Sequence, residues 1–181
     1  MSRVQLINPA QTTRERQVLL DQIQAAFGAT PNMFKAAANS PAALQSMAGS
    51  FRALGAGILD AKLSEQIAVA IAQRNRCEYC LAAHTALGKG AGVSAEELAD
   101  AQSGQSKDPR TAAALTFALK VVSQRAQLSD ADVQALRAVG FDDEHVVEIL
   151  AHVALNLFTN YINVAFDVPV DFPPVKLKPV D

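Results

Sequence analysis

Residues 65–84 read EQIAVAIAQRNRCEYCLAAH and contain both cysteines of the chain, Cys77 and Cys80, in a C-x-x-C motif. His84 follows four residues after the second cysteine, and an apolar, helix-like stretch carrying one acid, Glu65, leads into the motif. In a reducing compartment, two cysteines at this spacing are typical of a catalytic, redox-sensing or metal-binding site. We therefore expect the rest of the chain to form a scaffold around this segment.

The spacing places the motif on one face of a helix. If a helix begins near Cys77, then Cys80 and His84 lie within roughly 60° of it around the helix axis. Unpaired backbone N–H groups and the helix dipole stabilise a thiolate in the first turn, and Arg74 and Arg76 add positive charge nearby. One thiolate can attack an electrophilic oxygen or a disulfide, and the other can then close an intramolecular disulfide. By this reasoning alone, Cys77 is the more reactive thiol.

A break at Asn75-Arg76 is expected to reverse the chain, so that the helix of Glu65 runs antiparallel to the helix of His84. Glu65 then returns to about the level of His84, where it can orient the imidazole or take a proton through water. His84 lies one turn from Cys80 and is the natural proton carrier for peroxide reduction. A carboxylate on a helix of alanine, valine and isoleucine needs a partner, because an unpaired buried charge is costly.

The whole chain, residues 1–181, predicts one all-α domain of about eight or nine helices, and no alternating run bounded by turn residues indicates a strand. Residues 1–11 are expected to be extended, and the proline-rich tail, residues 168–181, to be non-helical and to pack over the body or a neighbour. Gly88, Gly90 and Gly92 are expected to close the helix of the cysteines. Caps and stop signals predict helices at about 12–27, 33–37, 41–54, 65–74, 77–89, 95–101, 109–125, 130–139 and 143–167.

Composition narrows the functional classes. Half of the 181 residues are hydrophobic, only 19% are charged, and the formal net charge is −2. The low charged fraction suggests that another subunit covers part of the surface, and the lack of a basic stripe argues against nucleic acid. Neither a secretion signal nor a membrane-spanning run of about 18 apolar residues is recognisable. We expect a cytoplasmic homo-oligomer that binds no nucleic acid, membrane, cofactor or metal.

A polar stripe runs along the last predicted helix. We interpret it as facing solvent or another subunit, opposite an apolar face, and the alternative is that His152 or Asn156 reaches the cavity of the site. The stripe comprises His145, Glu148, His152, Asn156, Asn160 and Asn163, and the apolar face comprises Val146, Leu150, Val153, Leu157 and Ile162.

The pattern E-x11-C-x-x-C-x3-H, from Glu65 to His84, resembles the alkyl hydroperoxidase D proteins of the carboxymuconolactone decarboxylase superfamily. The resemblance is strongest from Leu63 to Gly92 and weaker over SPAALQSM and the helices after Asp108. It implies an all-α fold, trimers or hexamers, and a thiol peroxidase activity on organic or hydrogen peroxide. An external dithiol, like dihydrolipoamide or thioredoxin, is the implied reductant.

The resemblance also implies roles for single residues. Cys80 is the peroxide-reacting thiol, Cys77 the resolving thiol, and Glu65 and His84 the proton relay. This reverses the helix-start preference for Cys77, and the closeness of His84 to Cys80 favours the reversal. Some members carry a histidine directly before the second cysteine, where this chain has Tyr79, so the implied relay is shorter.

Other interpretations of the same residues stay open. Some superfamily members are cofactor-free lactone decarboxylases, although that chemistry needs no pair of thiols. A non-enzymatic redox-sensing protein can use the same disulfide as a switch. A zinc site would need His145, His152 or an acid beside the two cysteines, because structural zinc usually takes four protein ligands. Finally, the cysteines and histidine can be ordinary core residues.

Overall fold

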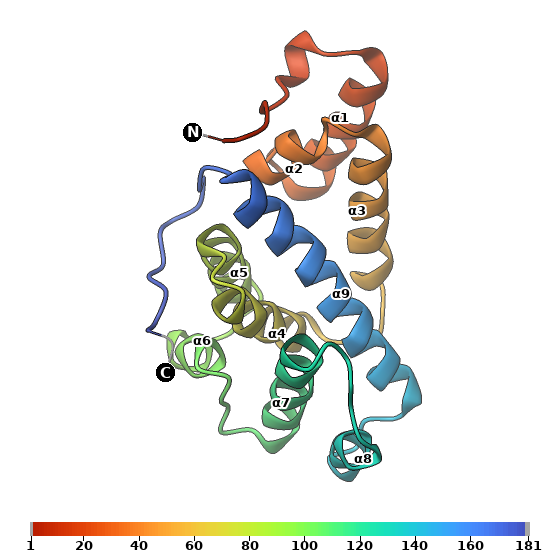
Figure 1. Ribbon diagram of the computed structural model, residues 1–181, viewed down its shortest axis with the longest axis vertical. Helices are drawn as coiled ribbons and strands as arrows, with labels where there is room; N and C mark the ends of the chain where they lie inside the picture. Colours follow the sequence, from red (N-terminus) through yellow and green to blue (C-terminus); the bar gives the residue numbers. More distant parts are fainter. Residues whose placement is uncertain (1, 180–181) are drawn as a thin grey trace.

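The computed structural model describes residues 2–179, and this part of the chain is helical with no strand. Figure 1 shows α9 crossing the front of the molecule, with α1 to α3 above it and α6 to α8 below. The elements of the described chain are η1 (Pro9–Gln11), α1 (Arg14–Phe27), α2 (Asn32–Ala37), α3 (Pro41–Leu54), α4 (Ala61–Arg74), α5 (Glu78–Gly90), α6 (Ala95–Gln102), α7 (Pro109–Ser123), α8 (Asp130–Ala138) and α9 (Asp143–Phe166).

Helices α4 and α5 form the hairpin around which the other helices pack. Helix α4 contacts α5, α6, α7 and α9, and its residues from Gln66 to Ala72 are all buried. Ile67 and Ile71 have no exposed surface. The hydrophobic residues of this segment go most of the way round the helix, which is typical of a helix covered on several sides.

The chain reverses between α4 and α5 at Asn75 and Arg76, as predicted. Arg76 adopts a left-handed backbone conformation with φ of 57°, which turns the chain sharply. Cys77 N donates a hydrogen bond to Ala72 O at 2.9 Å. Asn75 Nδ2 donates to Oδ1 of the fully buried Asn160 of α9 at 3.0 Å. The corner is therefore held from within α4 and from α9.

One predicted boundary of the hairpin is wrong. Helix α4 begins at Ala61 rather than Glu65, because Asp60 caps it by accepting a hydrogen bond from Leu63 N at 3.0 Å. Helix α5 ends at Gly90, close to the predicted end, but Gly88, which was expected to help close it, lies inside the helix. A Cβ atom at Gly88 would lie 2.8 Å from Leu98 Cδ2 and 3.5 Å from Glu65 Cβ. The missing side chain therefore permits close packing of α5 against α4 and α6.

The polar stripe on α9 is buried, so its interpretation as a solvent-facing or subunit-facing surface is wrong. His152, Asn156, Asn160 and Asn163 are each less than 10% exposed. The opposite side of α9 is exposed and apolar, with Val147 66% and Tyr161 59% accessible. By length and composition α9 is apolar enough to cross a membrane, but half of its apolar window is buried among the other helices.

The C-terminal tail packs over the body, in line with the first of its two predicted placements. Gln73 Nε2 and the Arg76 guanidinium donate to Lys178 O at 3.0 and 2.6 Å. Asp171 Oδ2 accepts a hydrogen bond from Asn32 N at 2.8 Å. Arg76 is therefore directed to the tail rather than to a sulfur. Residues 180 and 181 of the predicted tail lie outside the described residues.

The burial of α4 predicts a large loss of stability when its core is truncated. Replacing Ile71 by alanine should lower the free energy of unfolding by about 2–5 kcal/mol, because it removes apolar burial and leaves a cavity. Replacing the exposed Arg74 of the same helix by alanine should change it by about 0.5 kcal/mol or less. Urea unfolding followed by circular dichroism measures both, and similar losses in the two variants would contradict the central place of α4.

Candidate active site

The two cysteines lie at the start of α5 and form a disulfide, with their Cα atoms 5.3 Å apart. Cys77 is the N-cap residue, and its Sγ accepts a hydrogen bond from Cys80 N at 3.2 Å. Both residues are almost fully buried, at 1% and 2% exposure. The predicted placement of both sulfurs in the first turn is confirmed, and unpaired N–H groups there stabilise negative charge on sulfur.

Asn163 of α9 also contacts the site. Its Nδ2 donates to Cys80 Sγ at 3.2 Å, and the residue is only 3% exposed. We singled out Asn163 in the sequence only as part of the polar stripe and did not connect it with the cysteines. The sequence did contain one signal for such a contact. Polar side chains recur every three or four residues on an otherwise apolar helix, and polar groups that become buried need partners.

Glu65 and His84 are paired, as the predicted hairpin requires. Glu65 Oε2 lies 2.8 Å from His84 Nδ1, and the two side chains are 20% and 14% exposed. A carboxylate on one ring nitrogen orients the imidazole and leaves Nε2 for another partner. The pair connects the second turn of α4 with the second turn of α5.

A cavity of about 200 Å³ borders Cys80 and His84. Its walls are mostly apolar, and α1, α2, α3, α5, α9 and the tail contribute to them. The aromatic residues that line it are Phe27, Phe34, Phe51, Tyr79 and Phe172. Cys77 does not line this cavity but faces a separate hollow beside Arg76, Glu78 and residues 167–170. The two sulfurs therefore border different spaces.

A second cavity, of about 190 Å³, also borders His84. We call it the rear chamber. Glu65, His84, His152 and Asn156 line it, so the two α9 residues reach the side of the site at Glu65 and His84 but not the cavity at Cys80. His84 lines both cavities, whereas Glu65 lines only the rear chamber. The histidine therefore separates an apolar space at the thiol from a more polar space behind it.

Tyr79 occupies the position at which some relatives carry a histidine. Its hydroxyl accepts a hydrogen bond from Met33 N at 3.2 Å, and its ring packs edge-on against Phe172. Burial, together with the neighbouring Asp171 carboxylate, raises the pKa of Tyr79 well above its usual value. The phenol therefore stays protonated at neutral pH and anchors α2 and the tail to α5.

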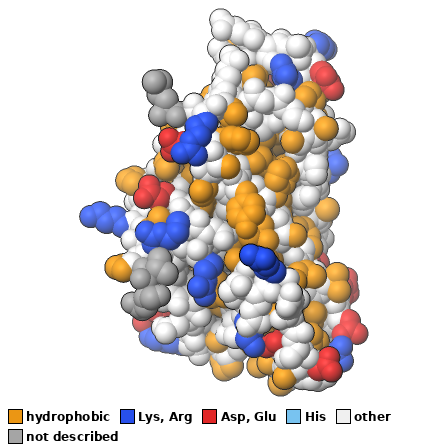
Figure 2. Space-filling model, viewed as in Figure 1, with side chains coloured by type: hydrophobic (Ala, Val, Ile, Leu, Met, Phe, Trp, Pro, Cys, Tyr) orange, Lys and Arg blue, Asp and Glu red, His pale blue; other side chains and the backbone are white. Residues whose placement is uncertain are grey.

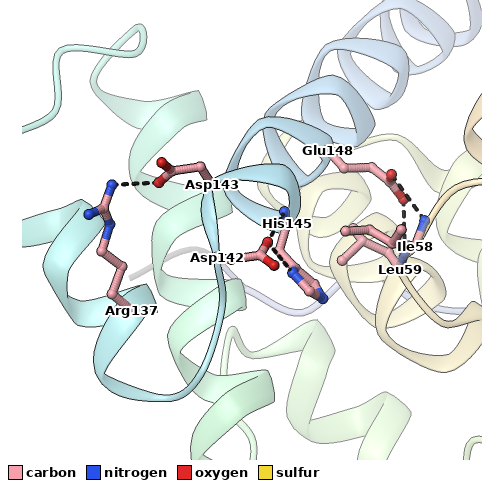
Figure 3. A network of polar contacts seen from close by, with 7 residues as sticks. All are labelled: Ile58, Leu59, Arg137, Asp142, Asp143, His145 and Glu148. Carbon is pink, nitrogen blue, oxygen red and sulfur yellow. Dashed lines mark hydrogen bonds and ion pairs between the residues drawn. The ribbon is translucent and has the colours of Figure 1, made fainter.

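The first turns of α9 carry a network of polar contacts, shown in Figure 3. Both carboxylate oxygens of Glu148 accept backbone hydrogen bonds, from Ile58 N at 3.1 Å and Leu59 N at 2.8 Å. Burial by itself would raise the pKa of Glu148, but these hydrogen bonds and the nearby histidines lower it overall. His145 is held by Asp142 at 2.6 Å and borders neither cavity.

Within residues 2–179, no group of three or more histidine, cysteine, aspartate or glutamate side chains is close enough to hold a metal ion. The two cysteines of the proposed zinc alternative therefore find no third ligand of these types in the described part of the chain.

Residues 38–122 match the family model described as the carboxymuconolactone decarboxylase family. A protein from Ralstonia eutropha JMP134, described as an alkylhydroperoxidase AhpD core and an uncharacterized peroxidase-related protein, has a similar structure. Its TM-score is 0.84 at 27% identity, over 94% of this chain and 92% of that one. A peroxidase-related protein from Silicibacter sp. TM1040 gives a TM-score of 0.79 at 25% identity, over 96% and 92% of the two chains.

The debrominase Bmp8, solved with 2,3,4-tribromopyrrole, shares the fold with a TM-score of 0.77 at 21% identity, over 94% of both chains. No curated protein sequence matches this chain. The comparisons extend the structural likeness beyond residues 38–122 to nearly the whole chain.

The contact between Asn163 and Cys80 predicts an effect on thiol reactivity. Replacing Asn163 by leucine removes the N–H donor at similar size, so alkylation of Cys80 by iodoacetamide in the reduced protein at pH 7 should slow roughly tenfold. Mass spectrometry of the labelled peptides measures it. Thr159→Val is the matched control, because it removes a cavity hydroxyl that bonds to Asn156 O rather than to sulfur. Equal rates in the two variants would contradict the prediction.

Proposed function

Since this chain is an alkylhydroperoxidase D-like protein of the carboxymuconolactone decarboxylase superfamily, we propose that it is a thiol-dependent peroxidase. Its substrate is an organic or hydrogen peroxide, and its redox centre is the Cys77–Cys80 pair. One observation carries the proposal: His84, which is paired with Glu65, lines the same cavity as Cys80. A thiol and a held imidazole that share one cavity are what proton-coupled attack on a peroxide requires.

In the first half of the cycle, Cys80 reacts with the peroxide. His84, oriented by Glu65, takes the proton of the Cys80 thiol, and the thiolate sulfur attacks one oxygen of the peroxide. The O–O bond breaks, the leaving alkoxide takes the proton from His84 to become an alcohol, and Cys80 becomes a sulfenic acid. Asn163 Nδ2, which donates to Cys80 Sγ, stabilises the charge on sulfur before the attack.

In the second half, Cys77 resolves the sulfenic acid. Its sulfur attacks Cys80 Sγ, the S–O bond breaks, and the leaving hydroxide takes the proton of the Cys77 thiol to form water. An external dithiol, like dihydrolipoamide or thioredoxin, then reduces the disulfide and is itself oxidised to a disulfide. Cys77 borders a hollow separate from the peroxide cavity, which supports attack of the reductant at this sulfur.

The fold alone does not choose among thiol chemistries, because function resides in the site and one fold carries several activities. The debrominase Bmp8 shares the fold at 21% identity. Two competing functions for this chain use fewer of its features. A lactone decarboxylase needs no disulfide, and a non-enzymatic redox sensor needs no imidazole and carboxylate beside the thiol. Peroxide reduction uses all four residues of the motif.

We further propose that the protein works in the cytoplasm as a homo-oligomer, a trimer or hexamer. The exposed side of α9 supports association, because its apolar residues repeat at alternating spacings of three and four, the pattern of helix–helix seams. Figure 2 shows hydrophobic side chains gathered where α9 crosses this face. The repeating residues are Val147, Leu150, Ala154, Leu157, Tyr161 and Val164.

The proposed peroxidase predicts peroxide consumption coupled to oxidation of a dithiol. Wild-type protein should consume cumene hydroperoxide or hydrogen peroxide with dihydrolipoamide or thioredoxin as reductant, and Cys80→Ser should lose this turnover. Replacing His84 by glutamine should lower kcat about a hundredfold or more, since general acid–base catalysis is lost. Peroxide loss measured by a ferrous–xylenol orange assay reports the rates.

Cys77→Ser provides the matched control. It should react with one equivalent of peroxide and stop at the Cys80 sulfenic acid, which dimedone labels. Equal turnover in wild type and Cys80→Ser would overturn the proposal. A wild-type protein that forms the disulfide with peroxide but shows no repeated turnover with either dithiol would instead favour the redox sensor.

The exposed seam on α9 predicts an association that a charge disrupts. Leu150→Glu, at a seam position that is 41% exposed, should shift the sedimentation coefficient toward that of a monomer, because an unpaired charge opposes burial. Arg137→Glu, an exposed change on α8, should leave the oligomer intact. A wild-type monomer at micromolar concentration would rule the oligomer out.

A further inference from the structure

The rear chamber holds more ionisable groups than the thiol reaction described above uses. Besides Glu65 and His84, it is lined by His152 and Asn156 of α9. His152 is 9% exposed and Asn156 is 5% exposed. His152 Nε2 and Asn156 Oδ1 are both buried without a hydrogen-bond partner among the described residues. Buried polar atoms of this kind are usually satisfied by water or a ligand.

The Glu148 carboxylate, whose contacts are shown in Figure 3, lies beside His152. His152 Nε2 is 4.0 Å from Glu148 Oε1, one helical turn earlier on α9. The carboxylate itself is fixed by two backbone N–H groups, those of Ile58 and Leu59. Gly57 makes room for it, because a Cβ atom there would collide with the carboxylate. A fixed negative charge therefore stands close to the imidazole at the wall of the chamber.

The charges around His152 come from three helices. Burial lowers the pKa of His152 below its usual value, Glu148 and Glu65 oppose this shift, and His84 adds to it. The imidazole is therefore neutral at neutral pH and takes up a proton in more acidic solution. Because its charge is felt by both Glu65 and His84, a proton on His152 changes the electrostatic environment of the pair that serves the thiol.

We propose that the rear chamber is the proton entrance of the active site and that His152, which lies beside Glu148, is the positioning residue through which Glu65 exchanges protons with water. The proposal rests on the thiol peroxidase function proposed above. Exchange with water is needed when Cys80 has released its proton to water and meets the peroxide as a thiolate. The Glu65–His84 pair then gives its own proton to the leaving oxygen and must regain one from water before the next cycle. The cavity at Cys80 is mostly apolar, whereas the rear chamber is more polar and has room for bridging water.

The first test needs no peroxide, because it measures the titration of His152 directly. The chain has three histidines, so two-dimensional NMR of 15N-histidine protein resolves them, and single variants assign them. Glu65→Gln and Glu148→Gln should each lower the midpoint of His152, by roughly one pH unit if the carboxylate lies close to the ring. Asp142→Asn is the control, because Asp142 contacts His145 rather than His152, so this change should leave the midpoint of His152 in place.

The second test measures the thiol reaction itself. His152→Gln should lower kcat for peroxide roughly tenfold at pH 7 and leave KM unchanged, because His152 does not line the cavity at Cys80. His145→Gln, the same change about two turns earlier on α9, should alter neither. In His152→Ala, added imidazole should restore kcat, because the vacated side chain enlarges the chamber. A purely structural role would allow no such rescue.

The two experiments separate this proposal from the function on which it rests. If wild-type protein consumes no peroxide, the pH profile of Cys80 alkylation in wild type and His152→Gln still decides whether His152 is coupled to the thiol. If His152→Gln fails to fold, Gly57→Ala displaces the Glu148 carboxylate and should give the same loss of kcat. The proposal would be overturned if the titration midpoint of His152 were the same in Glu65→Gln as in wild type. It would also be overturned if His152→Gln had the same kcat and KM as wild type.

Discussion

The structure depends on one constraint: the buried polar side chains of α9 need partners, because an unpaired buried polar group is costly. Helix α9 turns His152, Asn156, Asn160 and Asn163 inward and leaves apolar residues outside, the reverse of an ordinary surface helix. Such burial is stable only where the polar groups find partners. Two of them do so on the α4–α5 hairpin, where Asn160 holds the corner at Asn75 and Asn163 contacts Cys80 Sγ. The contacts that pack α9 against the hairpin are therefore also the contacts that build the site.

The α4–α5 hairpin positions the Glu65–His84 pair next to both cavities of the site. Because α4 and α5 pack closely at Gly88, Glu65 reaches His84, and the pair stands between an apolar cavity at Cys80 and the rear chamber. In the proposed peroxidase, the peroxide and the exchanged proton reach the imidazole from these two cavities. Cys77 borders a third space, apart from both.

Most of the helices and the core of the motif were predictable because they depend on local chemistry. Periodicity, caps and glycines marked the elements, and the break at Asn75-Arg76 predicted the pairing of Glu65 with His84. The errors have physical causes. Asp60 capped α4 before the expected start, and Gly88 served close packing rather than helix termination. The polar stripe on α9 was assigned to the wrong side, because a helix with polar and apolar faces does not itself reveal which face the protein covers.

The sequence by itself determined the all-α class, the placement of both thiols in the first turn of a helix, and the spacing that returns Glu65 to His84, because each follows from contacts between residues near in the chain. Only the tertiary structure decided which spaces the sulfurs border, that Asn163 donates to Cys80, and that His152 and Glu148 stand behind the site. Those contacts join α9 to the hairpin and to the loop at Ile58 across 80 residues or more. No local pattern specifies them, because they arise only when the helices pack and each buried polar group must find a partner.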